Sequence, residues 1–93
     1  MDIHFIQTSL NQDNALELCL KYKNDDDLII LAGSAVSGLL QKQWQRKLLN
    51  IDVKILSDDI MAQGLAEKLK HFDAINYQQF IEQTLKYNKV ISW

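Results

Sequence analysis

The chain has 93 residues, 47% of them hydrophobic and 24% charged, and its formal net charge is −2. This composition excludes a disordered chain, and the length fits one domain over residues 1–93. Lys and Arg are scattered without forming a basic stripe, which argues against direct nucleic-acid binding by this chain alone.

The first third of the chain predicts a strand followed by a helix. IHFIQ, residues 3–7, is short and apolar enough to form a buried strand. Three side chains that can cap a helix follow it: Ser9, Asn11 and Asn14. From Ala15 to Tyr22 the apolar residues cover most of the helix circumference, which indicates a helix packed on more than one side.

The middle third predicts two strands joined by a long helix. LIILA, residues 28–32, is a continuous apolar run, typical of a strand covered on both faces in a parallel sheet. Gly33 turns the chain into a second helix, which is expected to end near Leu49. IDVKIL, residues 51–56, is the third predicted strand, because its apolar residues alternate.

The last third is expected to add two helices and two short strands. SDDIMAQ forms a short helix that Gly64 ends, and residues 65–72 form a helical turn or a loop. A short strand in DAIN leads into the last helix, where Asn76 and Gln79 make a capping box. KVISW closes the chain as a strand.

Strand and helix therefore alternate from end to end, without proline, linker or internal repeat. Right-handed crossovers between parallel strands place helices on both faces of such a sheet. We expect a three-layer α/β/α sandwich with a mainly parallel sheet of about five strands.

The loops at the carboxyl ends of the strands, where such sheets form their sites, carry no complete catalytic motif. LAGSAVSG continues as Leu-Leu, whereas a phosphate loop needs Gly-Lys-Ser or Gly-Lys-Thr, so no cofactor is expected. His4 and His71 lack the spacing of metal ligands, and no metal site is expected. Asp58 and Asp59 are interpreted as first-turn carboxylates that stabilise a helix dipole.

Cys19 is the only cysteine, which excludes an internal disulfide. It lies about two turns into the first helix, beyond the N-terminal turn that lowers a thiol pKa. Lys23 would favour the thiolate and Glu17 would oppose it. From these neighbours Cys19 is interpreted as a packing residue, with a working nucleophile as the alternative.

The N-terminal residues lack a basic segment followed by an apolar run, and no segment approaches the ~20 apolar residues that cross a bilayer. A cytoplasmic location is therefore expected.

Four segments carry a family resemblance: IHFIQTSL, LIILAGSAV, LSDDIMAQGL and NYQQFIEQTLKYNKVISW. In this order they resemble the opening strand, the second strand with its turn, the third-helix segment and the closing segment of the DsrH/TusB family. That family belongs to the DsrE-like superfamily, and the resemblance spans essentially the whole chain. The chain departs from the pattern at two places: it has Gly-Ser-Ala-Val, with Ser34, where the family often has Asp-Gly-Val, and Gln63 replaces an arginine.

The resemblance implies a subunit of a cytoplasmic hetero-oligomer that relays sulfur as cysteine persulfide. Its partners would be DsrE/TusD-like and DsrF/TusC-like subunits in a heterohexamer. In the Tus branch the relay leads to 2-thiouridine at the tRNA wobble position, and in the Dsr branch it serves dissimilatory sulfur oxidation. The main persulfide cysteine of the family lies in the DsrE/TusD-like partner, so this chain is expected to be a non-catalytic or auxiliary subunit.

Some DsrH-like members carry a cysteine in a context similar to LELCLK, which makes Cys19 a candidate secondary persulfide acceptor. Candidate partner contacts are the bulky apolar residues Leu39, Leu40, Trp44 and Trp93, with core burial as the alternative. Three hypotheses stay open: a scaffold in a tRNA-thiolation complex, a Dsr-type relay through Cys19, and a free-standing flavodoxin-like ligand binder. The absence of a phosphate loop counts against the third.

Overall fold

The computed structural model describes residues 1–93 and contains one five-stranded sheet. The strands are β1 (Ile3–Ile6), β2 (Leu28–Leu31), β3 (Val53–Leu56), β4 (Asp73–Ile75) and β5 (Val90–Ser92). They lie in the order β4-β3-β2-β1-β5, and every neighbouring pair is parallel. The sheet and its helices confirm the predicted α/β sandwich.

The helices follow the predicted order. They are α1 (Ala15–Tyr22), α2 (Ser34–Ser37), the 3-10 turn η1 (Gly38–Leu40), α3 (Lys42–Lys47), α4 (Ser57–Ala62) and α5 (Tyr77–Lys86). Between the end of α4 and the start of β4 the chain forms a series of turns. Gly64, just beyond α4, adopts a positive φ of 69°. That conformation suits the residue that ends a helix.

The long second helix expected between Gly33 and Leu49 is divided into α2, η1 and α3. Gly38 lies so close to Leu10 that an added Cβ would come within 2.7 Å of that side chain. Gln41 is extended, with φ −83° and ψ 131°, and this interrupts the helical path. The Gln45 side chain donates to the Leu39 carbonyl at 2.8 Å and so satisfies an acceptor near the break.

The sequence predicted the N-terminal cap of α5 correctly, but it did not predict how α1 is capped. The capping box of α5 is confirmed, because Asn76 and Gln79 exchange two hydrogen bonds of 2.8 Å. Asn14 is the cap residue of α1, but its side chain makes no capping bond. Instead, a carboxylate oxygen of Asp13 accepts from the Ala15 backbone N–H at 2.8 Å.

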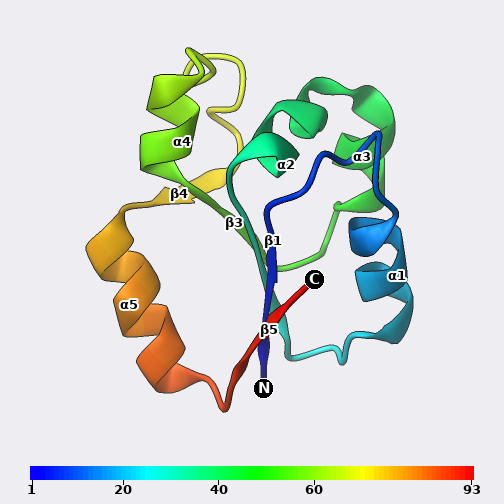
Figure 1. Ribbon diagram of the computed structural model, residues 1–93, viewed down its shortest axis with the longest axis vertical. Coiled ribbons are helices and arrows are strands. Elements are labelled where there is room, and N and C mark those ends of the chain that lie inside the picture. The colour runs from blue at the N-terminus through cyan, green and yellow to red at the C-terminus, as the bar shows by residue number, and fades with distance from the viewer.

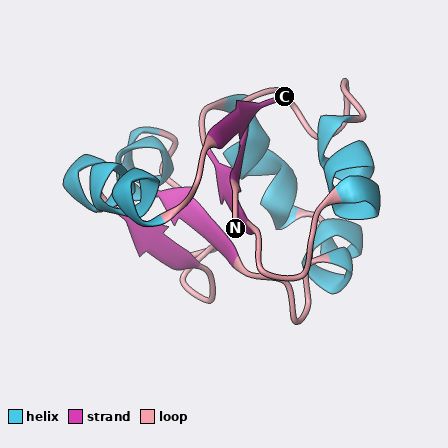
Figure 2. Cartoon of the chain, turned by 90° about the horizontal axis from the view of Figure 1, so that it is seen from below, coloured by secondary structure: helices cyan, strands magenta, loops and turns pink.

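Strand order determines how the helices are distributed. Strands β1 to β4 advance across the sheet in one direction, so right-handed crossovers place their connecting helices over one face. The chain then returns from β4 to β5 through α5, over the other face. Figures 1 and 2 show α1 and α3 on one side of the sheet and α5 on the opposite side.

The two faces of the sheet bury different numbers of residues. Seventeen buried residues from the sheet, from α1 to α4 and from the segments that connect them form one cluster, which we call the large core. On the α5 face only four buried residues cluster, Ile3, Leu28, Ile30 and Ile75, with partly buried neighbours such as Phe5, Leu56, Phe80 and Tyr87. No residue of α5 is itself buried.

Candidate functional site

A cleft of about 390 Å³ opens where the strands end, the position at which parallel sheets form their sites. We call it the carboxyl-end cleft. Its lining consists of Phe5, Gln7, Ala32, Gly33, Leu56, Asp59, Tyr77 and Phe80. The Phe80 ring lies 5.2 Å from the Phe5 ring and 6.1 Å from the Tyr77 ring, centroid to centroid, so three aromatic side chains make one wall.

The opposite side of the cleft is the turn at Gly33, which α4 holds in place. A carboxylate oxygen of Asp59 accepts from the Gly33 backbone N–H at 2.8 Å, and the Gln63 amide donates to the Gly33 carbonyl at 2.9 Å. Gly33 has a positive φ of 54°, a conformation that side chains disfavour. Asp59 therefore does more than the predicted dipole stabilisation, because it also fixes this turn.

The two departures from the family pattern meet at the same turn. Gln63 binds the carbonyl of Gly33, and Ser34 is the next residue in the chain. The neutral Gln63 amide and the Asp59 carboxylate thus hold this turn together.

The carboxyl-end cleft has no activated nucleophile. Its lining contains no Cys, Ser, Thr, Lys or His, and the Asp59 carboxylate and the Gly33 N–H are bound to each other. A nucleophilic mechanism needs an activated side chain within reach of a base. The aromatic wall is suited to contact with an apolar or polarisable group, and no base in the lining stands ready to activate the Tyr77 hydroxyl.

Cys19 lies elsewhere, on the inner side of α1 in the large core, and is fully buried. Burial raises the pKa of its thiol from 9.0 to about 11, and the charge of Asp27 adds to this rise while Lys23 opposes it. The thiolate is the nucleophilic form of cysteine, and at neutral pH this thiol is protonated. These observations favour the packing interpretation, and the acceptor role stays a prediction.

The four candidate contact residues fall into two pairs. Leu39 is completely buried and Trp44 is 5% exposed, so both lie in the large core, which is the alternative that the sequence left open. The Trp44 indole N–H has no hydrogen-bond acceptor, and the Lys47 ammonium lies 4.7 Å from the ring centroid. Leu40 and Trp93 are 40% and 37% exposed and are accessible to a partner.

An apolar surface on α5 was not among the predicted contacts. Tyr77, Ile81 and Leu85 recur every four residues along the helix and are all exposed. We call these three residues the α5 stripe. The sequence places these residues on one stripe of the last helix, but their spacing alone does not show that the side chains are exposed.

A second polar cluster joins the start of the chain to its last strand. His4 is buried, as expected, and its Nε2 lies 2.8 Å from a carboxylate oxygen of Asp27. The Trp93 indole N–H donates to Nδ1 of His4 at 3.0 Å. Burial raises the pKa of Asp27, but hydrogen bonds from His4 and from the backbone N–H groups of Asp2 and Asn24 outweigh it and hold the pKa at about 2.

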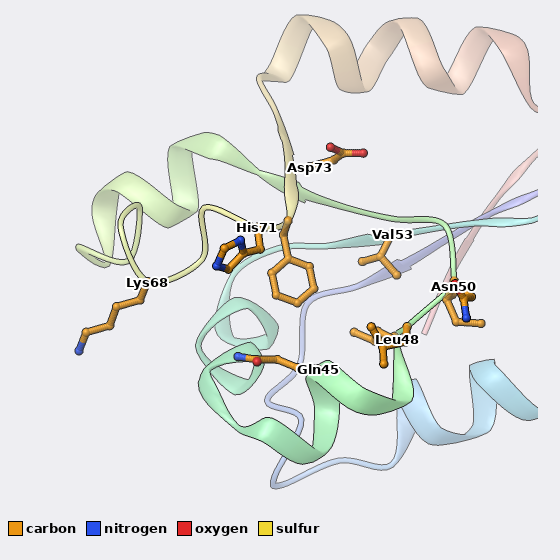
Figure 3. Close-up of a pocket in the computed structure, with 10 residues that line it drawn as sticks. Gln45, Leu48, Asn50, Val53, Lys68, His71 and Asp73 are labelled. Atoms are coloured by element: carbon orange, nitrogen blue, oxygen red, sulfur yellow. The ribbon is translucent and has the colours of Figure 1, made fainter.

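A further cavity of about 450 Å³ lies between α3 and the turns before β4 (Figure 3). Leu48 and Val53 contribute to its apolar floor, while the exposed His71 and Lys68 stand at its rim. It adjoins the first residues of β3 and β4, which is the end of the sheet opposite to the carboxyl-end cleft. Its polar side chains are exposed and none converges on a common point in Figure 3.

Across residues 1–93, no three His, Cys, Asp or Glu side chains gather in a way that could hold a metal ion. None of the helices combines the length and the apolar character that spanning a membrane requires.

Comparison with known proteins adds an independent observation. A family model described as "DsrH like protein" matches residues 8–90. A curated protein named Protein TusB from Buchnera aphidicola subsp. Baizongia pistaciae is 26% identical over 98% of this chain and 99% of its own length. A Protein TusB from Serratia proteamaculans is 34% identical over 73% of this chain and 75% of its own length. A third, from Buchnera aphidicola subsp. Acyrthosiphon pisum, is 24% identical over 98% of this chain.

Proposed function

The chain belongs to the DsrH-like family, and from that premise we propose that it is a non-catalytic subunit of a heteromeric sulfurtransferase that relays persulfide sulfur. The sulfur is destined for 2-thiouridine at the tRNA wobble position. The TusB name of the similar curated proteins supports this tRNA branch over dissimilatory sulfur oxidation.

One observation carries the non-catalytic part of the proposal. The only thiol of the chain is fully buried, and burial raises its pKa to about 11. A persulfide relay requires a thiolate that can reach a partner's sulfur atom. In this proposal the reactive cysteine is supplied by a DsrE/TusD-like partner.

The carboxyl-end cleft then has a supporting role in the relay. Its wall of Phe5, Tyr77 and Phe80 presents aromatic edges and faces, and sulfur makes favourable contacts of about 0.3–1.5 kcal/mol with aromatic rings. We place a persulfide-bearing segment of the partner against this wall. The cleft shelters the sulfur without competing for it, because its lining holds no thiol and no activated nucleophile.

The partner surface is proposed to include the α5 stripe and Trp93. The stripe lies on the sparsely covered side of the sheet, next to the carboxyl-end cleft that Tyr77 also lines. Aromatic and large apolar side chains supply much of the binding energy at protein interfaces. The chain itself carries a net charge of −2, so contact with tRNA is left to other subunits.

Co-expression with DsrE- and DsrF-like siblings tests the function, with thiolation measured by mass spectrometry of digested tRNA. A strain lacking this chain should lose 2-thiouridine, and both the wild-type chain and Cys19→Ser should restore it. A +32 Da adduct on Cys19 that passes to an acceptor would instead make the chain a relay station. Unchanged 2-thiouridine in the deletion strain would contradict the proposed role in tRNA thiolation.

A further inference from the structure

The His4–Asp27–Trp93 network links three segments that are far apart in the sequence. His4 lies in β1, Asp27 precedes β2, and Trp93 follows β5. Asp27 also accepts from the backbone N–H groups of Asp2 and Asn24, at 2.9 and 3.0 Å, so its carboxylate is fixed from several directions. The imidazole is therefore held on one side by a firmly placed anion.

The bond from Trp93 determines which ring nitrogen of His4 carries the proton. An indole N–H can only donate, so Nδ1 of His4, 3.0 Å away, must present its lone pair. The proton of the neutral ring then resides on Nε2, which donates to Asp27 at 2.8 Å. In this arrangement both nitrogens are satisfied only while His4 is neutral.

We propose that protonation of His4 releases the Trp93 side chain, and we call this arrangement the latch. A proton added to Nδ1 places two N–H donors opposite each other across the 3.0 Å contact, and the Trp93 hydrogen bond breaks. The bond to Asp27 survives and becomes an ion pair. The backbone N–H of Trp93 remains bound to the Phe5 carbonyl at 3.1 Å, so the indole turns away while the strand stays in place.

The latch requires that a proton reaches His4 itself, so the groups around the ring decide whether its charge is disturbed by others. Its strand neighbours in register are Ile29 and Ile91, neither of which titrates. Asp27 stays ionised throughout the range in which imidazoles titrate, because its pKa is about 2. The Cys19 thiol on α1 has its pKa raised to about 11 and stays protonated, and Lys23 lies just beyond that helix. At the end of α5, burial and the charges of Asp52, Asp26 and Asp27 raise the pKa of Tyr87, so its hydroxyl stays neutral as well.

The remaining charges near the network lie on the far side of Asp27. The amino group of Met1 is 4.0 Å from the second oxygen of Asp27 and 3.7 Å from the exposed Asp26. These groups face the carboxylate and are separated by it from the nitrogen that Trp93 contacts. The latch consequently acts on the indole at the outer edge of the sheet, where β5 has no further strand beside it.

NMR of the complete ¹⁵N-labelled chain tests this proposal, with the indole N–H of Trp93 and the His4 ring followed from about pH 8 to about pH 5. The Trp93 signal should move with the same midpoint as the His4 ring. Its exchange with solvent should rise about fivefold or more, the ratio expected from the loss of one ordinary hydrogen bond. The Trp44 indole, which has no acceptor, should stay unchanged and serves as a control within the same molecule.

Three variants test whether the Trp93 transition is caused by His4. His71→Gln removes the exposed histidine and should leave the Trp93 transition intact, whereas His4→Gln should abolish it. Trp93→Phe should shift the titration of His4 to higher pH, because the bond that favours neutral His4 is gone; this test does not depend on whether His4→Gln folds. A Trp93 signal that stays constant while His4 titrates overturns the proposal, as does a His4 ring that never titrates in this range.

Discussion

The two faces of the sheet differ in how completely this chain covers them. Over the face of α1 to α4, seventeen buried residues form the large core. Over the α5 face the buried cluster has four residues, and the only covering helix buries none of its own. The first face is covered completely by this chain. On the second face the amphipathic helix α5 leaves the α5 stripe exposed.

This difference has a physical consequence for a chain of 93 residues. Domains of this size bury little more than ~60% of their unfolded surface and have modest stability of their own. The large core supplies the fold, and the exposed apolar surface of the other face is available for association. We therefore assign stability to one face and partner binding to the other.

The largest effect on stability is expected when a side chain of the large core is truncated. Leu31→Ala removes a fully buried side chain of β2 and should lower the free energy of unfolding by ~2–5 kcal/mol, measured by urea denaturation. Leu49→Ala, on an exposed residue beyond α3, is the matched control and should cost less than ~0.5 kcal/mol. Equal losses in the two variants would mean that the large core is not the source of stability.

The reactivity of the Cys19 thiol tests how well the large core excludes solvent and reagents. Since the pKa of Cys19 is raised from 9.0 to about 11, its thiolate fraction at pH 8 should be about 100-fold below that of an exposed thiol. Reaction with a disulfide reagent should slow by at least that factor compared with the urea-unfolded chain. Equal rates in the native and unfolded chains would show that α1 opens readily, and they would restore Cys19 as a relay candidate.

Asp27 makes the stability of the chain depend on pH. Its carboxyl pKa is lowered from 3.8 to about 2, so the contribution is complete above pH 4 and is lost as the pH falls from 3.8 through about 2. The amount is about 2 kcal/mol, measured by urea denaturation at a series of pH values. Asp27→Asn should flatten this dependence, while Asp26→Asn, on an exposed neighbour, should leave it unchanged.

The smallest effect on stability is expected on the α5 stripe. Leu85 is 81% exposed, so Leu85→Asp should change the free energy of unfolding of the isolated chain by less than ~0.5 kcal/mol. Thermal unfolding of this variant beside the wild type provides the measurement. A clear loss of stability would mean that the stripe packs within the chain, which would remove the contrast between the faces.

The sequence predicted those features that depend on neighbouring residues. Continuous apolar runs located the buried strands, and the spacing of Asn76 and Gln79 located a capping box that the structure confirms. The division of the second helix at the extended Gln41 was not predicted, and neither was the close approach of Leu10 to Gly38 from another part of the chain. Local spacing carries no information about such contacts.

The candidate site shows the same limit. Leu39 and Trp44 have the size and type of interface anchors, and only the packing of η1 and α3 onto the sheet reveals that they are core residues. The α5 stripe was visible as a periodic pattern, but its direction depends on which side of α5 meets Phe5. The network of His4, Asp27 and Trp93 joins residues up to 89 positions apart, which no local motif indicates.

The central claim is that the sparsely covered face binds the sibling subunits. The most direct test is co-purification of DsrE- and DsrF-like partners with the Leu85→Asp variant, beside Met61→Asp on the other face, where Met61 is 71% exposed. We expect Leu85→Asp to lose the partners while remaining folded, and Met61→Asp to retain them. Retention of the partners by Leu85→Asp, or their loss from Met61→Asp alone, would contradict the account.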